Sequence, residues 1–354
     1  MVKTIYLSSF NERAGKTLIA MGLLQKFKKE GYNVKYFKPV GKPIGELTNK
    51  ADRDVSFIFM NIIESEHDID TICPVSITPN YYIDNIDIEQ RTEYTEKIKK
   101  AYEKIKQDCD MVIIEGTPNF RYYCRVGLDD VTIAKELGID GIYFILDVST
   151  DNFVDTLLFT KKYLDFREMK INGLIMNQID FDYVERVKEL QKKHIEKYDI
   201  PLVGIIQKDP SLSEPTVLEI MEGIGAELIN NPPDESMNKN VKSILIGAMD
   251  VPSAMKYVRQ SVNAACITGG DRSELILATL ESNVSVIILT GYIQPDISVK
   301  VKADELGIPL LLSPSDTYTT LYNIERIKPG IQPEEKHIAL EIIEKYINWE
   351  LLKP

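Results

Sequence analysis

Short continuous runs of apolar residues alternate along the chain with longer segments in which apolar residues recur at helical spacing. Such runs are typical of parallel strands buried on both faces, and the intervening segments are typical of the helices that cover them. Up to residue 225 we expect a doubly wound α/β domain that binds ligands at the carboxyl ends of its strands. The expected strands are 5–9, 34–37, 111–114, 141–146, 171–176 and 202–206, and the expected helices are 15–30, 95–107, 153–166 and 183–198.

The same alternation resumes after a stretch, Asn230 to Asn238, that is rich in Asn, Pro and acidic residues. We interpret residues 226–240 as a linker between a first domain, 1–225, and a second, 241–354. The second domain is predicted to be a smaller α/β domain. Its expected strands are 243–246, 264–267, 284–289 and 309–312, with helices between them and an amphipathic helix at 334–346.

Composition narrows the classes of protein that this pattern allows. The 354 residues are 44% hydrophobic, the formal net charge is −12 and the pI is about 5.0. An acidic chain argues against non-specific binding of nucleic acid. Four scattered cysteines without a CxxC pair predict reduced thiols in a cytoplasmic protein. No apolar run reaches the ~18 residues of a membrane span and no secretory signal is recognisable, so no membrane partner is expected.

The first expected strand runs into a polar loop and then into Gly15-Lys16-Thr17, which opens the first helix. Unpaired N–H groups and the positive end of a helix dipole converge on an anion in such a segment. Asn11 and Gly15 belong to the loop that would cradle the phosphates of a nucleotide. Lys16 would reach the terminal phosphates, and Thr17 would ligate Mg²⁺. Phe10 replaces the usual first glycine of the loop, so a surface helix that begins with Gly-Lys-Thr by chance is the alternative.

Other polar residues end strands at the same expected edge of the sheet. Glu115 closes the strand 111–114, the place of a carboxylate near Mg²⁺ in phosphate-loop proteins. Asp147 closes the next strand and is the alternative, and either carboxylate can instead cap the loop that follows it. Asn177 can hydrogen-bond an adenine, or it can be an ordinary strand-ending residue in a turn.

The second domain has a candidate ligand or interface site in the sequence Thr268-Gly269-Gly270-Asp271-Arg272. The two glycines allow a positive φ and a backbone nest. Asp271 is expected to cap a helix that begins at Arg272, and Arg272 is a suitable partner for a phosphate or a carboxylate. A tight, well-capped turn without any ligand explains the same residues.

Together these motifs resemble the non-catalytic amino-terminal half of long phosphate acetyltransferases, in which a dethiobiotin-synthetase-like P-loop domain precedes a DRTGG domain. The resemblance covers nearly the whole chain and implies a P-loop NTPase-like fold followed by a smaller α/β domain. In the first domain it rests on "GKT", "FKPVG", "ADRDVSF", "VIIEG" and "GLIMNQ". In the second it rests on "ILIGAMDVPSA", "ACITGGDRSELILATLES", "VIILTGYIQPD" and "GIPLLLSPSDTYTT".

The resemblance also implies roles for individual residues. Lys16 and Thr17 match the dethiobiotin synthetase residues that serve phosphate and Mg²⁺. Lys38 matches a lysine that engages the carbamate of the substrate, so Lys16 and Lys38 are the implied catalytic residues. ATP and Mg²⁺ are the implied cofactors. The remaining counterparts are Asp54 and Glu115, which match magnesium ligands, and Asn177, which matches an asparagine near the adenine.

Three loops depart from that family. The chain has Ser9-Phe10-Asn11-Glu12 where the family has Gly-Thr-Asp-Thr, so Phe10 and Glu12 bring bulk and negative charge toward the anion. Gly41-Lys42-Pro43 and Gly116-Thr117-Pro118-Asn119 replace loops that shape the substrate site, and dethiobiotin synthesis is therefore not expected. The acetyl-transferring domain of the longer enzymes has no counterpart in these 354 residues, so acetyl transfer is not expected either.

Two functions are compatible with these features. The first is a regulatory or sensor protein that binds ATP with Mg²⁺ in its P-loop domain and self-associates or senses an effector through its DRTGG domain. The second is an ATP-dependent, carboxylate-activating ligase of the dethiobiotin synthetase or cobyrinate amidase type. The altered substrate loops favour the first, with a nucleotide, a second copy of the chain and an enzyme as expected partners.

Overall fold

The computed structural model describes residues 2–353, apart from 13, 43–51, 64–66, 78–81, 210, 211, 213, 328 and 330–334. The chain forms two compact units. The first contains residues 1–208 and 331–354, and the second contains residues 209–330. Pro43 of an altered loop and Glu334 of the expected terminal helix lie outside the described residues.

In its described part, the first unit contains a parallel sheet of six strands in the order β2-β5-β1-β6-β7-β8. After β1 the chain continues to β2 at one edge of the sheet, and after β5 it passes β1 and continues to β6, β7 and β8 on the other side. The direction in which strands are added therefore reverses beside β1. In such sheets ligands bind at the carboxyl ends of the strands near this reversal. The strands are β1 (Lys3–Ser9), β2 (Val34–Phe37), β5 (Met111–Glu115), β6 (Gly141–Asp147), β7 (Lys170–Ile179) and β8 (Leu202–Gln207), beside a small pair, β3 (Val40–Gly41) and β4 (Val75–Ser76).

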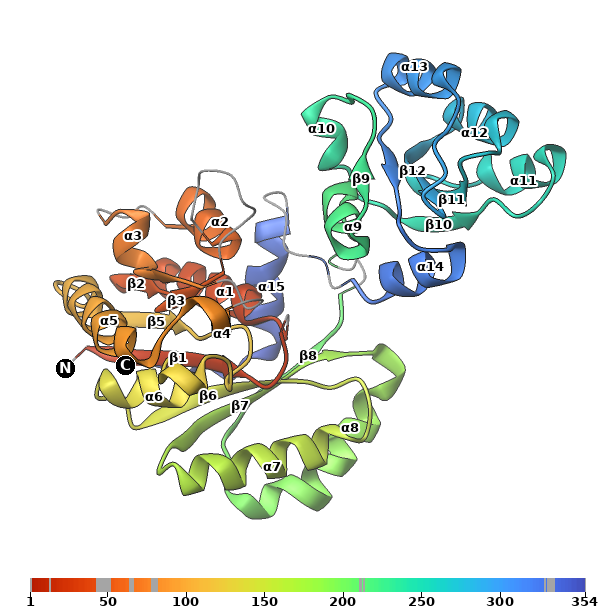
Figure 1. The fold of residues 1–354 in the computed structure, drawn as a ribbon. Coiled ribbons are helices and arrows are strands. Elements are labelled where there is room, and N and C mark those ends of the chain that lie inside the picture. The colour runs from red at the N-terminus through yellow and green to blue at the C-terminus, as the bar shows by residue number, and fades with distance from the viewer. Residues whose placement is uncertain are drawn as a thin grey trace. The chain divides into compact units, whose positions relative to one another are not determined.

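Helices cover both faces of this sheet (Figure 1). α1 (Lys16–Lys29) packs with α15 (Lys336–Tyr346) on one face. Right-handed crossovers place α5 (Arg91–Ile105), α6 (Asp130–Glu136) and α7 (Phe153–Phe166) on the other. The remaining α-helices of the unit are α2 (Arg53–Asn61), α3 (Ile69–Ile72), α4 (Tyr82–Asn85) and α8 (Val184–Leu190).

The described part of the second unit is built on a five-stranded sheet in the order β10-β11-β12-β13-β9, with only β9 antiparallel to its neighbour. Alternate residues of its central strands face two separate cores. Cys266 and Ile287 point to one, and Ile267 and Ile288 point to the other. The strands are β9 (Glu227–Leu228), β10 (Ser243–Ile246), β11 (Ala264–Gly269), β12 (Val284–Thr290) and β13 (Leu310–Leu312). The helices are α9 (Val217–Ile224), α10 (Asp234–Met237), α11 (Val251–Val258), α12 (Ser273–Leu280), α13 (Ile297–Leu306) and α14 (Thr317–Glu325).

The predicted fold class is confirmed: a doubly wound parallel α/β sheet is followed by a smaller α/β unit. The strands at 34–37 and 243–246 and the helix at 153–166 have the predicted bounds. The helix expected at 183–198 is regular only over Val184–Leu190, since the next residues adopt π and 3₁₀ turns.

The structure divides the chain at other positions than the linker expected at 226–240. Glu227 and Leu228 form β9 and pair with β13. The buried amide of Asn230 donates to the carbonyl of Ile308 at 3.0 Å and accepts from the N–H of Leu310 at 2.8 Å. These bonds build the segment into the second unit, so its Asn and Pro residues shape a turn rather than a hinge.

The terminal helix α15 also differs from the expectation, because it belongs to the first unit and not to the second. It approaches α1 so closely that a Cβ at Gly22 would lie 2.3 Å from Ile343 Cγ1 and 2.9 Å from the carbonyl oxygen of Ala339. Its amphipathic pattern predicted an apolar face correctly, but such a pattern does not specify which helix covers that face.

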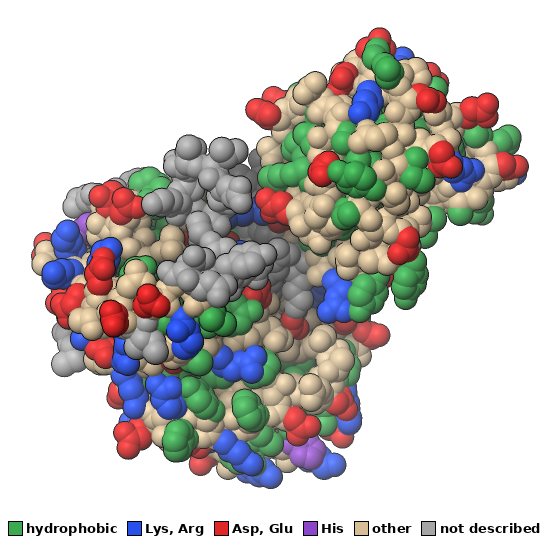
Figure 2. Space-filling view, viewed as in Figure 1, with side chains coloured by type: hydrophobic (Ala, Val, Ile, Leu, Met, Phe, Trp, Pro, Cys, Tyr) green, Lys and Arg blue, Asp and Glu red, His purple; other side chains and the backbone are tan. Residues whose placement is uncertain are grey.

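On the face shown in Figure 2, acidic and basic side chains are interspersed over the first unit. Ion pairs also lie along α5 and α7, with Lys97 2.8 Å from Glu93 and Lys161 2.6 Å from Asp165. Within the described ranges, every helix is too short or too polar to cross a lipid bilayer.

Candidate functional site

The loop between β1 and α1 has the backbone geometry of an anion-binding loop. Gly15 adopts φ 96° and ψ 19°, a left-handed conformation that favours glycine, and α1 begins at the next residue. No described side chain caps this end of the helix. The N–H groups of its first turn are therefore directed to the loop, where they can bind an anion.

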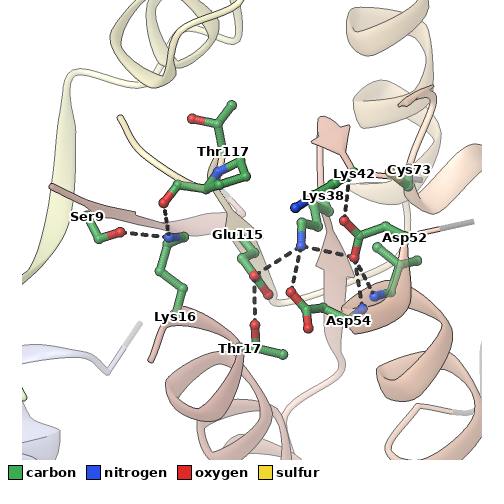
Figure 3. Close-up of polar contacts among 12 residues, drawn as sticks. Ser9, Lys16, Thr17, Lys38, Lys42, Asp52, Asp54, Cys73, Glu115 and Thr117 are labelled. Atoms are coloured by element: carbon green, nitrogen blue, oxygen red, sulfur yellow. Dashed lines mark hydrogen bonds and ion pairs between the residues drawn. The ribbon is translucent and has the colours of Figure 1, made fainter. Parts of the chain in front are cut away.

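Lys16 lies beneath this loop and is only 5% exposed. Its Nζ donates to Ser9 Oγ at 2.6 Å and to the carbonyl oxygen of Pro118 at 3.0 Å, so it links the ends of β1 and β5 (Figure 3). Burial lowers the pKa of the Lys16 ammonium, while the charges of Glu115 and Asp130 oppose that shift. Both partners of Lys16 are neutral acceptors, which a phosphate can replace with a charged one.

Thr17, the next residue, begins a chain of polar contacts across the carboxyl ends of the strands. Its Oγ1 donates to Glu115 Oε1 at 2.9 Å. The same oxygen lies 3.2 Å from Lys38 Nζ, and Tyr36 donates to the other oxygen of Glu115 at 2.8 Å. The choice of Glu115 over Asp147 is consistent with this contact, since Glu115 ends β5 while Asp147 ends β6 on the other side of β1.

Lys38 is surrounded by carboxylates. Its Nζ lies 3.1 Å from Asp52 Oδ1, 3.1 Å from Asp54 Oδ2 and 3.2 Å from Glu115 Oε1 (Figure 3). Lys38, Asp52 and Glu115 are buried, whereas the Asp54 side chain is 44% exposed and its pairing is screened more by solvent.

The ionisation of this cluster follows from burial and from the charge of Lys38. Burial alone would lower the pKa of Lys38, but the three carboxylates outweigh it and raise that pKa well above its usual value. Burial raises the pKa of Glu115, and Lys38 counteracts the rise. For Asp54 the desolvation is outweighed by Lys38, so the pKa of Asp54 is lowered. The ammonium therefore stays charged at neutral pH.

Asp52, which sequence reasoning did not select, is the most firmly held of these carboxylates. It caps α2 by accepting from the N–H groups of Asp54 at 2.9 Å and Val55 at 3.1 Å, and its other oxygen accepts from the N–H of Lys42 at 2.7 Å. An Asp before an apolar helical segment is a capping signal that was present in the sequence.

The chemistry of the donor set fits Mg²⁺. Thr17, Asp54 and Glu115 supply a hydroxyl and two carboxylates, which are hard oxygen ligands. Over the ranges that the structure describes, no cluster of three or more His, Cys, Asp or Glu forms a metal site by itself. A magnesium ion that binds with a nucleotide does not need one, because phosphate oxygens and waters complete its shell.

The other two residues predicted to bind nucleotide lie at the loop but contact different atoms. Asn177 is buried, and its Nδ2 donates to the carbonyl of Ala14 at 2.8 Å. A Cβ at Gly15 would lie 2.2 Å from that Nδ2, so Asn177 supports the loop from below. The Asn11 side chain is exposed, and its carbonyl accepts from Ser9 Oγ at 2.8 Å. A contact of Asn177 with adenine stays a prediction.

Asp130 is a second carboxylate that sequence reasoning missed. It is fully buried and accepts from Ser8 Oγ at 2.5 Å, from the N–H of Thr117 at 2.7 Å and from Thr117 Oγ1 at 2.9 Å. It thereby ties the end of β1 to the loop after β5. Its place in the sequence resembles an ordinary helix start, so no signal distinguished it.

Phe10, which occupies the position of the usual glycine, packs sideways and is held by the loop after β5. Its ring lies 5.9 Å from the ring of the buried Phe120, and the Arg121 guanidinium lies 4.8 Å above it. Glu12 hydrogen-bonds Tyr122, which together with burial raises the pKa of that phenol to about 12. Phe10 and Glu12, two departures from the family, are therefore held by the residues that directly follow the altered loop Gly116–Asn119.

The candidate turn of the second unit differs from the expectation in three respects. Neither Gly269 nor Gly270 has a positive φ. Instead, a Cβ at Gly270 would lie 1.9 Å from the carbonyl oxygen of Ile293, so glycine is needed for a close approach. The helix begins at Ser273 and not at Arg272, and Asp271 does not cap it. Finally, the Arg272 guanidinium donates to the carbonyls of Gly247 and Met249. Thr268, the remaining candidate, is buried and also donates to Gly247, at 3.3 Å.

A parallel sheet whose central strand leads into a Gly-Lys-Thr loop, with a buried carboxylate at the end of the neighbouring strand, defines a P-loop type of α/β protein. The family model of AAA domains matches residues 3–216, more than half of the chain, and the chain belongs to that family. Residues 219–327 match the DRTGG domain. The predicted combination of a P-loop domain and a DRTGG domain is thus confirmed.

Curated relatives match the chain at low identity. A phosphate acetyltransferase of Synechocystis sp. is 24% identical over 358 residues, covering 95% of this chain and 49% of that protein. One of Nitratidesulfovibrio vulgaris is 23% identical, covering 98% and 51%. The chain spans about half the length of these relatives. An ATP-dependent dethiobiotin synthetase of Methanocaldococcus jannaschii is 28% identical over 216 residues, covering 57% of this chain and 93% of that protein.

Solved structures align with parts of the chain. Cobyrinic acid a,c-diamide synthase from Mycobacterium smegmatis, with bound ADP and magnesium, aligns with a TM-score of 0.36 at 14% identity, covering 57% of this chain and 85% of that one. The CBS and DRTGG regulatory region of Clostridium perfringens pyrophosphatase, complexed with diadenosine tetraphosphate, aligns with a TM-score of 0.28 at 19% identity. It covers 43% of this chain and 71% of that one.

Proposed function

We propose that the chain binds ATP with Mg²⁺ in its first unit and acts as a regulatory or sensor protein. The observation that carries this proposal is the buried Lys16 at an uncapped helix N-terminus, directly beside the Thr17–Glu115 contact. Lys16 and the first-turn N–H groups would hold the phosphates. Thr17, Asp54 and Glu115 would hold Mg²⁺, whose charge would neutralise those phosphates.

The loop after β5 supports regulation over catalysis. Thr117 and Asn119 are buried, and Phe120 packs with Phe10, Phe144 and Tyr163. In dethiobiotin synthetases the corresponding loop shapes the substrate site, whereas here these side chains are buried or packed against other rings of the first unit and offer few groups to a substrate. The alternative is an ATP-dependent ligase, favoured by the presence of Lys38, which would stabilise negative charge on a transferring phosphoryl group together with Lys16.

The proposal extends to self-association through the second unit. Ile297 and Val301 lie one turn apart on α13 and are 80% and 52% exposed. Ile246, on the edge strand β10, is 45% exposed. A second copy of the chain can cover such an edge and such a face.

Titration calorimetry with ATP and Mg²⁺ tests the nucleotide site. In Lys16→Ala we expect the affinity to fall by about 100-fold or more, because a buried charge against phosphate is lost. Lys29→Ala is the matched control, since Lys29 lies on the same helix with its side chain 61% exposed, and it should bind like the wild type.

Absence of heat from the wild type at millimolar ATP and Mg²⁺ would contradict the proposal and favour an empty loop. Brisk release of phosphate in the presence of a small carboxylate would favour the ligase instead.

A further inference from the structure

The Lys38 ammonium is bound to the same carboxylate oxygens that would bind Mg²⁺. It lies 3.1 Å from Asp54 Oδ2 and 3.2 Å from Glu115 Oε1, and Thr17 donates to that same Oε1. Mg²⁺ requires such oxygens at about 2.1 Å in near-octahedral geometry. The Lys38 ammonium and a divalent cation therefore compete for the same two carboxylates. Their positive charges also repel each other.

Asp52 is a further ion-pair partner of the Lys38 ammonium, outside the expected metal ligands. Its Oδ1 lies 3.1 Å from Lys38 Nζ. Asp52 is fixed by three backbone N–H groups, from Lys42, Asp54 and Val55, and is not among the residues that would hold the metal. Lys38 and Asp52 are both buried, so the pair would be costly to break. When Asp54 and Glu115 bind a metal, Asp52 can remain the ion-pair partner of Lys38.

We propose that Lys38 is an internal competitor of the divalent cation, which withdraws to Asp52 when the metal binds Asp54 and Glu115. In this arrangement Lys38 keeps the carboxylates neutralised in the absence of nucleotide. The phosphates of the nucleotide then supply the negative charge that allows both cations to remain. Metal binding is thereby coupled to nucleotide binding. The inference rests on the proposed function, because it takes Asp54 and Glu115 as the metal ligands.

The test measures binding of Mn²⁺ alone, as a probe for Mg²⁺, by the electron paramagnetic resonance signal of the free ion. Lys38→Met removes the competitor and should tighten Mn²⁺ binding by roughly tenfold or more, since one neighbouring unit charge changes a carboxylate's affinity for a proton by about that factor. Asp52→Asn removes the carboxylate to which Lys38 would withdraw, so this substitution should weaken Mn²⁺ binding by a similar factor. Lys42→Met is the matched control: Lys42 meets the cluster through its backbone N–H, and its side chain is exposed, so no change is expected.

The opposite signs separate competition from a structural role, which would weaken Mn²⁺ binding in both variants. A folded Lys38→Met that binds Mn²⁺ no more tightly than the wild type overturns the inference. If Lys38→Met does not fold, Asp52→Asn decides: unchanged or tighter Mn²⁺ binding overturns the inference.

Addition of ADP distinguishes failure here from failure of the proposed function. In the wild type, ADP should tighten Mn²⁺ binding, and in Lys38→Met the gain should be smaller. If ADP binds normally and raises the Mn²⁺ affinity equally in the wild type and in Lys38→Met, the nucleotide site is supported but the proposed competition is overturned. Absence of ADP binding to a folded wild type would contradict the nucleotide site itself.

Discussion

Each unit contains a parallel strand that runs into a glycine-containing loop and then into a helix, with a basic residue at the start of the helix or directly before it. In the first unit that residue is Lys16, whose ammonium donates to the neutral acceptors Ser9 and Pro118 among the described residues, next to a left-handed Gly15. In the second it is Arg272, whose guanidinium is bound to the carbonyls of Gly247 and Met249. The first loop is arranged to receive an anion, whereas the second is closed by its own backbone. A glycine-containing loop with a basic residue near the start of the next helix therefore does not by itself indicate a ligand site.

Among substitutions that test this difference between the two loops, Gly270→Ala is expected to have the largest effect. Its Cβ would lie 1.9 Å from a backbone oxygen that cannot move without the loop, so the free energy of unfolding of the second unit should fall by about 3 kcal/mol. Urea denaturation measures the loss. Gly223→Ala is the control, because its nearest neighbour is the flexible end of Ile327 and alanine favours a helix.

Pulsed alkylation of cysteine shows which unit opens in Gly270→Ala. Burial raises the pKa of Cys266 to about 11, and burial with the charge of Asp52 raises that of Cys73 to about 12, so neither thiol reacts until its unit opens. Labelling of Cys266 without Cys73 is expected. Equal labelling of the two would contradict a closed, self-contained turn in the second unit.

A smaller effect is expected from Arg272→Ala. Loss of two charged hydrogen bonds to carbonyls should lower the free energy of unfolding of the second unit by about 1–3 kcal/mol and leave ATP affinity unchanged. Urea denaturation and calorimetry check both, with the exposed Arg259→Ala as the control.

Light scattering of the same proteins addresses self-association. Because the Arg272 guanidinium serves the fold of its own unit, the oligomeric state should not depend on it. A wild type that is monomeric at high concentration would contradict the proposed self-association. Loss of ATP binding in a folded Arg272→Ala would show that the two loops are coupled.

The smallest effect is expected from Glu12→Gln in the first loop. Removal of one negative charge near the phosphates should tighten ATP binding by about two- to fivefold, since a partly buried charge is worth about 1 kcal/mol at a helix N-terminus. Calorimetry at low and high salt measures the gain, which should shrink as salt screens the charge. An unchanged affinity at low salt would mean that Glu12 faces away from the bound anion.

Regular elements were predictable because buried parallel strands carry continuous apolar runs. The central strand β5, predicted over 111–114 and observed over Met111–Glu115, is buried along its whole length and illustrates this. Glu115 was predictable because it ends such a strand, whereas Asp54, which also meets Lys38 at the site, was selected through the resemblance alone. Asp130 was missed because its partners Ser8 and Thr117 are remote in sequence, and hydrogen bonds between remote residues leave no local pattern.

Where the structure differs from the predictions, the difference lies in the partners that a segment contacts. Gly269 and Gly270 were selected because glycine allows a positive φ, but at Gly270 glycine is needed because the backbone of Ile293 approaches closely, which no sequence spacing indicates. The stretch around Asn230 was assigned to a linker on composition, yet its amide completes the edge of a sheet. In each case the partner is distant in sequence, and only the folded chain identifies it.

The return of the chain to its first unit after residue 330 has a consequence for biosynthesis. A ribosome releases α1 early, but α15, which covers it at Gly22, emerges only after the whole second unit. Until then the face of α1 that receives Ile343 has no partner, and the nascent first unit must wait with apolar surface exposed. Folding of residues 209–330 in the meantime shortens the effective span between β8 and α15, which lowers the entropy lost when that last helix docks. The order of translation thus makes the inserted unit an aid to the completion of the unit that surrounds it in sequence.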